Sequence, residues 1–205
     1  MRYSLLVAVL LAGPASAATL FQVTGPVGIA WTSSASQVLY ASWTQSASFT
    51  NVDVSALLGG TGTASAFLTD QIGAGTTVGN VIASTTLSYP GSATLTSLFS
   101  GLSLGAGTYY LIIGGTGAGN WSQADPPTVT TDPSVSGNGY GFCSSVPGSC
   151  NFGFTPASTF VAFDILQSQL LVTGDASGVP EPSTAATAAI ALLALAVFGK
   201  LRRHC

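Results

Sequence analysis

Apolar and polar residues alternate over short runs through the middle of the chain, which is the period of a β-strand rather than of a helix. The run at residues 108–113 has the strongest strand composition, because aromatic and β-branched residues fill it and glycines bound it at 105–107 and 114–115. Glycine- and proline-rich steps at 25–26, 59–62 and 90–91 predict turns. The other predicted strands lie at 19–31, 37–44, 48–58, 63–69, 81–87 and 159–173.

The pattern of apolar and polar residues does not determine the secondary structure of two segments. Residues 94–104 fit either a strand with a turn or a short helical turn. Residues 117–156 are rich in Gly, Pro, Ser and Asn, with aromatic residues scattered among them. Because a structureless loop of this length is unusual in a compact domain, we expect the segment to be partly folded over one end of it.

Many short strands separated by Gly/Pro/Ser turns predict an all-β fold over residues 18–178, an antiparallel β-sandwich or jelly-roll-like domain. Its Ser/Thr-rich strand faces are expected to point to solvent. The run at 102–111, Leu-Ser-Leu-Gly-Ala-Gly-Thr-Tyr-Tyr-Leu, resembles a turn-and-strand element of many extracellular β-sandwich modules. That resemblance bears on architecture and not on function.

The end of the chain has a different pattern. Pro180 and Pro182 fix φ and lack an N–H group, so residues 179–182 are expected to be extended. An uncharged run rich in Ala and Leu follows over residues 183–199. It is apolar on all sides and lies at the short end of the about 17–25 residues that span a bilayer as a helix. A basic stop follows and is expected to hold this end in the cytoplasm; its residues are Lys200, Arg202 and Arg203.

These three parts, in this order, resemble the PEP-CTERM protein-sorting signal of Gram-negative bacteria. The resemblance covers residues 179–205, and its sorting and cleavage motif is Val179, Pro180, Glu181 and Pro182. It implies recognition by the membrane protease-transpeptidase exosortase, transient residence in the inner membrane, and release or attachment at the cell surface. Such proteins occur in bacteria that make exopolysaccharide. The alternative is a plain C-terminal membrane anchor behind a proline-rich stalk.

The N-terminus has the pattern of a secretory signal peptide over residues 1–17. Arg2 supplies a positive charge, residues 5–11 form a short apolar core, and small residues follow. Ala15 and Ala17 suit a signal peptidase, so we expect cleavage after Ala17 and a new N-terminus at Ala18. Both ends of the chain therefore predict export across the inner membrane.

Charge restricts the function of residues 18–178 more than any motif. Among the 205 residues there are 4 Lys and Arg and 1 His, and all of them lie in the two end segments. Binding of nucleic acid or phosphate requires cations, so neither is expected. Ser-His-Asp and Cys-His catalysis lack their base, and a transition-metal site lacks imidazole ligands. We expect neither cofactor nor metal.

The cysteines agree with an oxidising compartment. Cys143 and Cys150 lie close together in sequence, so a disulfide between them is expected after export. The loop is short, and the bond would stabilise the fold by about 2–3 kcal/mol at most. A redox or metal pair is the alternative.

Three aromatic residues in the segment 117–156 are candidates for ligand binding: Trp121, Tyr140 and Phe142. Aromatic rings stack on sugars, and neighbouring amide and carboxylate groups bind hydroxyl groups, without need of a cation. The alternative is that these rings form the segment's own small core.

The aspartates give weaker indications of a functional site than the aromatic residues do. Asp70, Asp125 and Asp132 carry oxygen ligands suited to Ca²⁺, but their spacing matches no calcium loop, and solvated turn residues are the simpler interpretation. A glycosidase with two carboxylates is chemically allowed, yet residues 18–178 contain no Glu. We therefore expect no catalytic residue and no enzyme.

Together these patterns predict an exported, exosortase-processed protein of the cell surface or extracellular matrix, associated with exopolysaccharide or biofilm. The alternative function is a carbohydrate-binding module that recognises exopolysaccharide through its aromatic residues.

Overall fold

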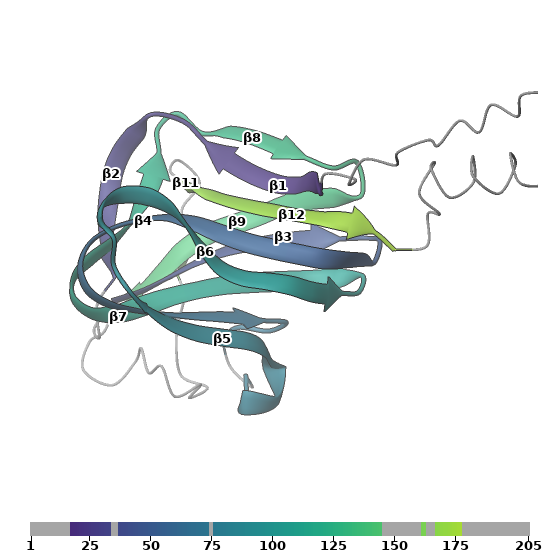
Figure 1. Ribbon diagram of the computed structural model, residues 1–205, viewed down its shortest axis with the longest axis horizontal. Coiled ribbons are helices and arrows are strands. Elements are labelled where there is room, and N and C mark those ends of the chain that lie inside the picture. Colours follow the sequence, from purple (N-terminus) through teal and green to yellow (C-terminus); the bar gives the residue numbers. More distant parts are fainter. Residues whose placement is uncertain (1–16, 34–36, 74–75, 145–160, 163–166, 178–205) are drawn as a thin grey trace, which may run out of the picture. The chain divides into compact units, whose positions relative to one another are not determined.

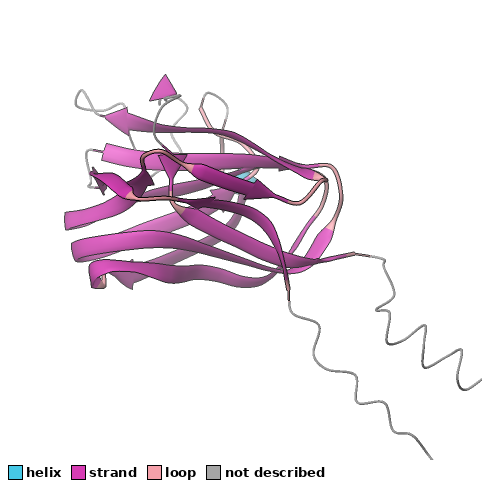
Figure 2. Cartoon of the chain, turned by 90° about the horizontal axis from the view of Figure 1, so that it is seen from above, coloured by secondary structure: helices cyan, strands magenta, loops and turns pink. Residues whose placement is uncertain are grey.

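The computed structural model describes residues 17–33, 37–73, 76–144, 161–162 and 167–177, and nearly all of them lie in β-strands (Figure 2). Its elements are β1 (Ala18–Thr24), β2 (Val27–Ser33), β3 (Gln37–Gln45), β4 (Phe49–Thr69), the 3-10 turn η1 (Val78–Asn80), β5 (Val81–Ser88), β6 (Gly91–Leu104), β7 (Gly107–Ala124), β8 (Thr128–Thr131), β9 (Val135–Ser144), β10 (Val161–Ala162), β11 (Gln167–Ser168) and β12 (Leu170–Ala176). The prediction of an all-β fold is confirmed.

The strands form one 12-stranded sheet in which every pairing is antiparallel. Its main path is β10-β9-β3-β7-β4-β12-β1-β8; β2 and β11 also pair with β7, and β5 and β6 also pair with β4. The first half of β4 lies between β12 and β6, and its second half lies between β7 and β5. Because β4 changes neighbours along its length, the sheet curls back over itself around a common core (Figure 1).

The bend in β4 lies where a turn was predicted. The prediction of a turn at residues 59–62 is wrong, since β4 runs through them without a break. Gly60 and Gly62 have φ of +87° and +107°, which bends the strand without ending its ladder. They lie opposite two glycines of β7, Gly119 and Gly117. The pair at 114–115 does not end its strand either, because β7 continues to Ala124.

The two undecided segments are also strands where they are described. Residues 94–104 belong to β6, which leaves no helical turn there. The segment 117–156 supplies the end of β7, all of β8 and all of β9, and β9 pairs along the whole of β3. Its described part is therefore built into the sheet rather than folded over one end of it.

Apolar side chains from alternate strand positions fill the concave side. Trp43 and Trp121 are both 0% exposed and are among the largest buried side chains. The ring of Trp43 lies 5.8 Å from that of Tyr109 and 6.4 Å from that of Phe21. Burial of each such ring stabilises the fold by about 1.5–3 kcal/mol. Residues 18–178 contain no cationic side chain and so form no ion pairs with one another, which means that the fold depends on this apolar burial.

One buried amide shows how polar groups in this core are satisfied. Gln45 is 1% exposed; its Oε1 accepts a hydrogen bond from Trp43 Nε1 at 3.2 Å. Its Nε2 donates to the carbonyl oxygens of Gly105 at 2.8 Å and Leu104 at 3.2 Å. The side chain thereby ties the end of β3 to the loop between β6 and β7.

The two predicted targeting segments lie at the ends of the chain. The residues of the predicted signal peptide up to Ser16, and the predicted sorting signal from Val179 onward, lie outside the described residues. In the part that the structure describes, no helix has the length and apolar character to cross a membrane.

Candidate functional site

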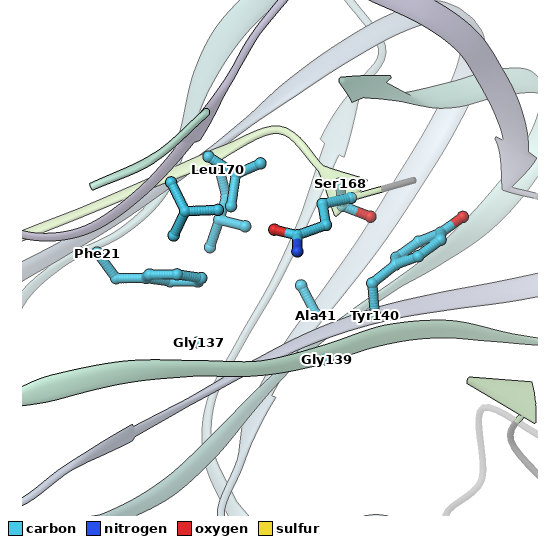
Figure 3. Close-up of a pocket in the computed structure, with 10 residues that line it drawn as sticks. Phe21, Ala41, Gly137, Gly139, Tyr140, Ser168 and Leu170 are labelled. Carbon is cyan, nitrogen blue, oxygen red and sulfur yellow. The ribbon is translucent and has the colours of Figure 1, made fainter. Parts of the chain in front are cut away.

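A cavity of about 140 Å³ lies against β9 on the concave side of the sheet (Figure 3). Figure 3 shows Leu170 and Ser168 on one side, the backbone at Gly137 and Gly139 on the other, and Phe21 and Tyr140 at the two ends. The described residues that line it are Phe21, Val23, Ala41, Val129, Gly137, Gly139, Tyr140, Gln167, Ser168 and Leu170.

The cavity exists because β9 carries glycine where a core strand normally carries a side chain. A register shift in the β3–β9 ladder places Ser42 opposite Gly139 and Trp43 opposite Gly137. A Cβ on Gly137 would lie 2.8 Å from Cε2 of Phe21, so this glycine leaves room for the Phe21 ring and the space beside it. Both glycines are exposed, and they form part of the opening to solvent.

The lining combines apolar walls with a few polar groups. Phe21, Val23 and Leu170 are at most 3% exposed and supply the apolar surface. Ser168 supplies a hydroxyl group, and Gln167 supplies an amide that is partly exposed. This composition is typical of a site for a small uncharged ligand, in which few polar groups orient an otherwise apolar contact.

A buried glutamine, Gln123, binds the hydroxyl group of Ser168. Gln123 is 0% exposed, and its Nε2 donates to Ser168 Oγ at 3.2 Å and to the Trp121 carbonyl at 3.0 Å. Its Oε1 is buried and accepts no hydrogen bond from the residues that the structure describes. Gln123 is not among the residues that line the cavity, so it acts on the cavity only through the Ser168 hydroxyl group that it binds.

The electrostatics of the cavity are neutral. No residue in its described lining is charged. Burial raises the pKa of Tyr140 far above its ordinary value, so this phenol stays protonated at physiological pH. In Figure 3 its hydroxyl group points away from the other labelled side chains, so the cavity meets the Tyr140 ring rather than its O–H group.

The structure corrects the expectation for Trp121. This residue lies within β7, opposite Leu58 of β4, and not in a loop. It is 0% exposed, and its Nε1 donates to the carbonyl oxygen of Gln169 at 2.8 Å. A sugar on the surface cannot reach this ring, because none of it is exposed to solvent.

The other two aromatic candidates have separate environments. Tyr140 lines the cavity and is 2% exposed. Phe142 is partly buried; its ring centroid lies 5.0 Å from that of Trp31 at an interplanar angle of 35°. Of the three predicted binding residues, therefore, Tyr140 alone lines the cavity.

Two of the three aspartates considered for Ca²⁺ accept hydrogen bonds from neighbouring residues. Asp70 Oδ1 accepts a hydrogen bond from Asn80 Nδ2 at 2.8 Å. Asp132 Oδ1 accepts hydrogen bonds from the backbone N–H of Ser134 at 2.8 Å and from its hydroxyl at 2.6 Å, which closes the turn after β8. Asp125 directly follows β7. The described ranges contain no group of three or more His, Cys, Asp or Glu residues that would hold a metal ion.

Several predicted positions lie outside what is described. They are Ala15, Cys150, Val179, Pro180, Glu181, Pro182, Lys200, Arg202 and Arg203, together with the side chain of Cys143. Ala17 and Ala18 are described, and β1 begins at Ala18, the residue that follows the predicted cleavage point.

Comparison with protein-family models, with curated proteins and with solved structures found no match to this chain. Its function is therefore inferred from its own residues.

Most of the residues that line the cavity were not predicted from the sequence. Phe21, Ser168 and Gln167 come from β1 and β11, which are distant from Tyr140 in sequence. A local signal was present in the alternation of glycine with larger residues in β9, whose sequence is VSGNGYGFCS. Glycine in the interior of a strand often marks a bulge or a close approach of another group, and the register shift between Ser42 and Trp43 lies at these glycines.

Proposed function

We propose that this protein is an exported, exosortase-processed, non-catalytic domain of the cell surface or extracellular matrix, built as a β-sandwich of the jelly-roll type. One observation carries the proposal: the folded unit fits between the two predicted processing points. β1 begins at Ala18, directly after the predicted signal-peptide cleavage, and β12 ends at Ala176, just before the sorting motif. Ala18 pairs with Gly174, so cleavage at either point would leave the sheet intact.

The chemistry of the domain supports a role in binding or display rather than catalysis. Residues 18–178 contain no Lys, Arg, His or Glu, so histidine and lysine bases and oxyanion-stabilising cations are missing from this segment, and its aspartates are the only acidic side chains. The described cavity is lined by uncharged groups. A surface protein of this kind acts through its shape and its hydrogen-bonding groups.

Replacement of Pro180, Glu181 and Pro182 by alanine tests the proposal. The variant should remain in the membrane fraction at the precursor mass, whereas the wild-type protein leaves it. Ser183→Ala with Thr184→Ala is the matched control, because it changes residues next to the motif and should be processed normally. If the triple variant had the same mature mass and the same location as the wild-type protein, exosortase processing would be refuted.

A second candidate function is recognition of a neutral glycan. The observation that favours it is the cavity of about 140 Å³, which combines the Phe21 and Tyr140 rings with Ser168 and the Gln167 amide. Uncharged sugars bind through such a combination of ring contacts and hydrogen bonds.

Affinity electrophoresis in gels that contain neutral polysaccharides tests this function. Gln167→Ala removes a partly exposed polar group of the cavity without deleting a core side chain, so it should weaken retention. Gln22→Ala is the control, because this glutamine does not line the cavity. Equal mobility of both variants and the wild-type protein in every gel would count against a glycan site here.

A further inference from the structure

β5 (Val81–Ser88) lies at a margin of the sheet. Among the described residues it pairs with β4 and with no other strand. Figure 1 shows it at the lower edge of the view, with no labelled strand beyond it. A strand in this position has one unused row of backbone hydrogen-bonding groups.

The ladder identifies which groups are unused. The backbone N–H of Tyr89 donates to the carbonyl oxygen of Gly62 at 3.0 Å, and the register then runs without a shift from Ser88 to Ala83. Antiparallel pairs alternate between residues that face the partner and residues that face away. The N–H and C=O groups of Ser84, Thr86 and Ser88 therefore point to the open side.

Two other margins of the sheet, β8 and β6, are protected in ways that β5 is not. β8 has 4 residues, with Pro127 directly before it and Pro133 shortly after it. β6 is long, but its pairing with β4 has four register shifts, which disrupt a regular edge. β5 has 8 residues, with no proline and no charged side chain. Charge, proline, bulges and short length are the usual means by which proteins block an edge.

The side chains of β5 are incompletely covered on the core side. Ala83 and Leu87 pack against the main core but are only partly buried. Ile82, on the opposite face, is 38% exposed. The core thus extends to the open edge, where an added strand would cover it further.

We propose that β5 pairs antiparallel with β5 of a second copy of this chain, about a two-fold axis near Thr86. Two identical edges without charge approach each other without like-charge repulsion. The nearest described acid, Asp70, lies beside Asn80 at the start of β5, so an antiparallel dimer places the two Asp70 carboxylates at opposite ends of the interface. Ser84, Thr86 and Ser88 of each copy then supply hydrogen-bonding pairs across the axis.

This pairing gives a closed dimer, because each copy uses the same edge and leaves none for a third. The biological role of the dimer rests on the proposed function, because a surface protein that dimerises would connect the two places at which its copies are attached. The pairing itself depends on β5 alone.

Sedimentation velocity of the full chain in a mild detergent tests the dimer. The wild-type protein should dimerise over about a hundredfold range of concentration, following mass action. Thr86→Lys places a charge at the exposed centre of β5 and should weaken dimerisation by at least about tenfold. Thr130→Lys is the matched control on another exposed edge strand, β8, and should dimerise like the wild-type protein. A wild-type monomer throughout, or a dimer that Thr86→Lys does not weaken, would overturn the proposal.

Thr86→Pro provides a second variant that adds no charge. It removes an N–H group that points to the open side, so the monomer should keep its fold and its circular dichroism while dimerisation is lost. Retained dimerisation of this folded variant would also contradict the proposal. The outcome is separate from the sorting test: a chain that dimerises through β5 but is never processed would refute the proposed function and leave the dimer standing.

Discussion

Glycine has opposite roles in two regions of this molecule. At the bend of β4, Gly60 and Gly62 face Gly119 and Gly117 of β7, and the missing side chains let two backbones approach closely. At the cavity, Gly137 of β9 faces a space, and the missing side chain leaves room for the Phe21 ring and the cavity beside it. The bend is a packed region, whereas the cavity is an open one.

The difference shows that a glycine-rich sequence does not by itself indicate a loop. Both regions lie within strands, and what distinguishes them is the group that faces the glycine. A carbonyl oxygen from the neighbouring strand faces Gly62, and an aromatic ring faces Gly137. Substitutions by alanine should therefore separate the two regions by the size of their effect.

The largest effect is expected for Gly62→Ala. A Cβ at this position would overlap the carbonyl oxygen of Thr116, and the φ of +107° is unfavourable for any residue with a side chain. Backbone strain and overpacking together should lower the free energy of unfolding by about 3 kcal/mol or more. Urea denaturation measures this loss, and a variant as stable as the wild-type protein would contradict the close approach of β4 and β7.

A smaller loss is expected for Gly137→Ala. Its Cβ would lie 2.8 Å from Cε2 of Phe21, but this ring has the adjacent cavity into which it can shift. The free energy of unfolding should fall by about 1–2 kcal/mol, and the cavity should become smaller. Chemical denaturation measures the first effect, and reduced retention in polysaccharide gels measures the second. A loss as large as that of Gly62→Ala would remove the distinction between the two regions.

Alkaline pH should weaken both regions through their buried tyrosines. Burial raises the pKa of Tyr89, although a hydrogen bond with Ser33 partly opposes it, and burial also raises the pKa of Tyr140. The unfolded chain releases these phenolic protons near pH 10, whereas the folded chain retains them. The contribution of these tyrosines to the free energy of unfolding is therefore fully present below about pH 10. Above that pH it falls, by up to about 1.4 kcal/mol per pH unit for each tyrosine.

Urea unfolding at several pH values measures this slope. Tyr89→Phe and Tyr140→Phe should each reduce the slope above pH 10, whatever they do to stability at neutral pH. An unchanged slope in both variants would show that other groups cause the alkaline loss.

The smallest effect is expected for Gly105→Ala. No atom lies within 4 Å of a Cβ built on this exposed glycine, and its φ lies outside the left-handed region. The backbone carbonyl that binds Gln45 is kept, so the free energy of unfolding should change by less than about 0.5 kcal/mol. A larger loss in the same denaturation assay would mean that glycine is required here for a reason other than contact.

The strands that were predicted best are those with strong local patterns. Alternation and composition located β3 and the first part of β7, because their side chains carry the signal themselves. The bend at 59–62 was misread as a turn, since the same glycines that permit a turn also permit two strands to pack closely. The pairing of strands that are far apart in sequence leaves no pattern in a short stretch of residues. The order of the strands in the sheet was therefore not predicted.

The candidate site was predicted only in part. Tyr140 was selected for its aromatic ring, and the structure places it at the cavity. Trp121 was selected for the polar residues around it, which lie in a strand whose neighbours bury them as well. Phe21 and Ser168 join the cavity through long-range pairing of β1 and β11, which the sequence does not reveal.

The proposed function requires that the chain is exported, cut at both ends and delivered to the cell surface. The most direct test is the intact mass of the natively produced protein in each cell fraction. We expect a chain that begins at Ala18 and ends near Val179 to Pro182, in the extracellular or surface fraction. A chain that extends through Cys205 in the inner membrane would contradict it and leave an anchored domain.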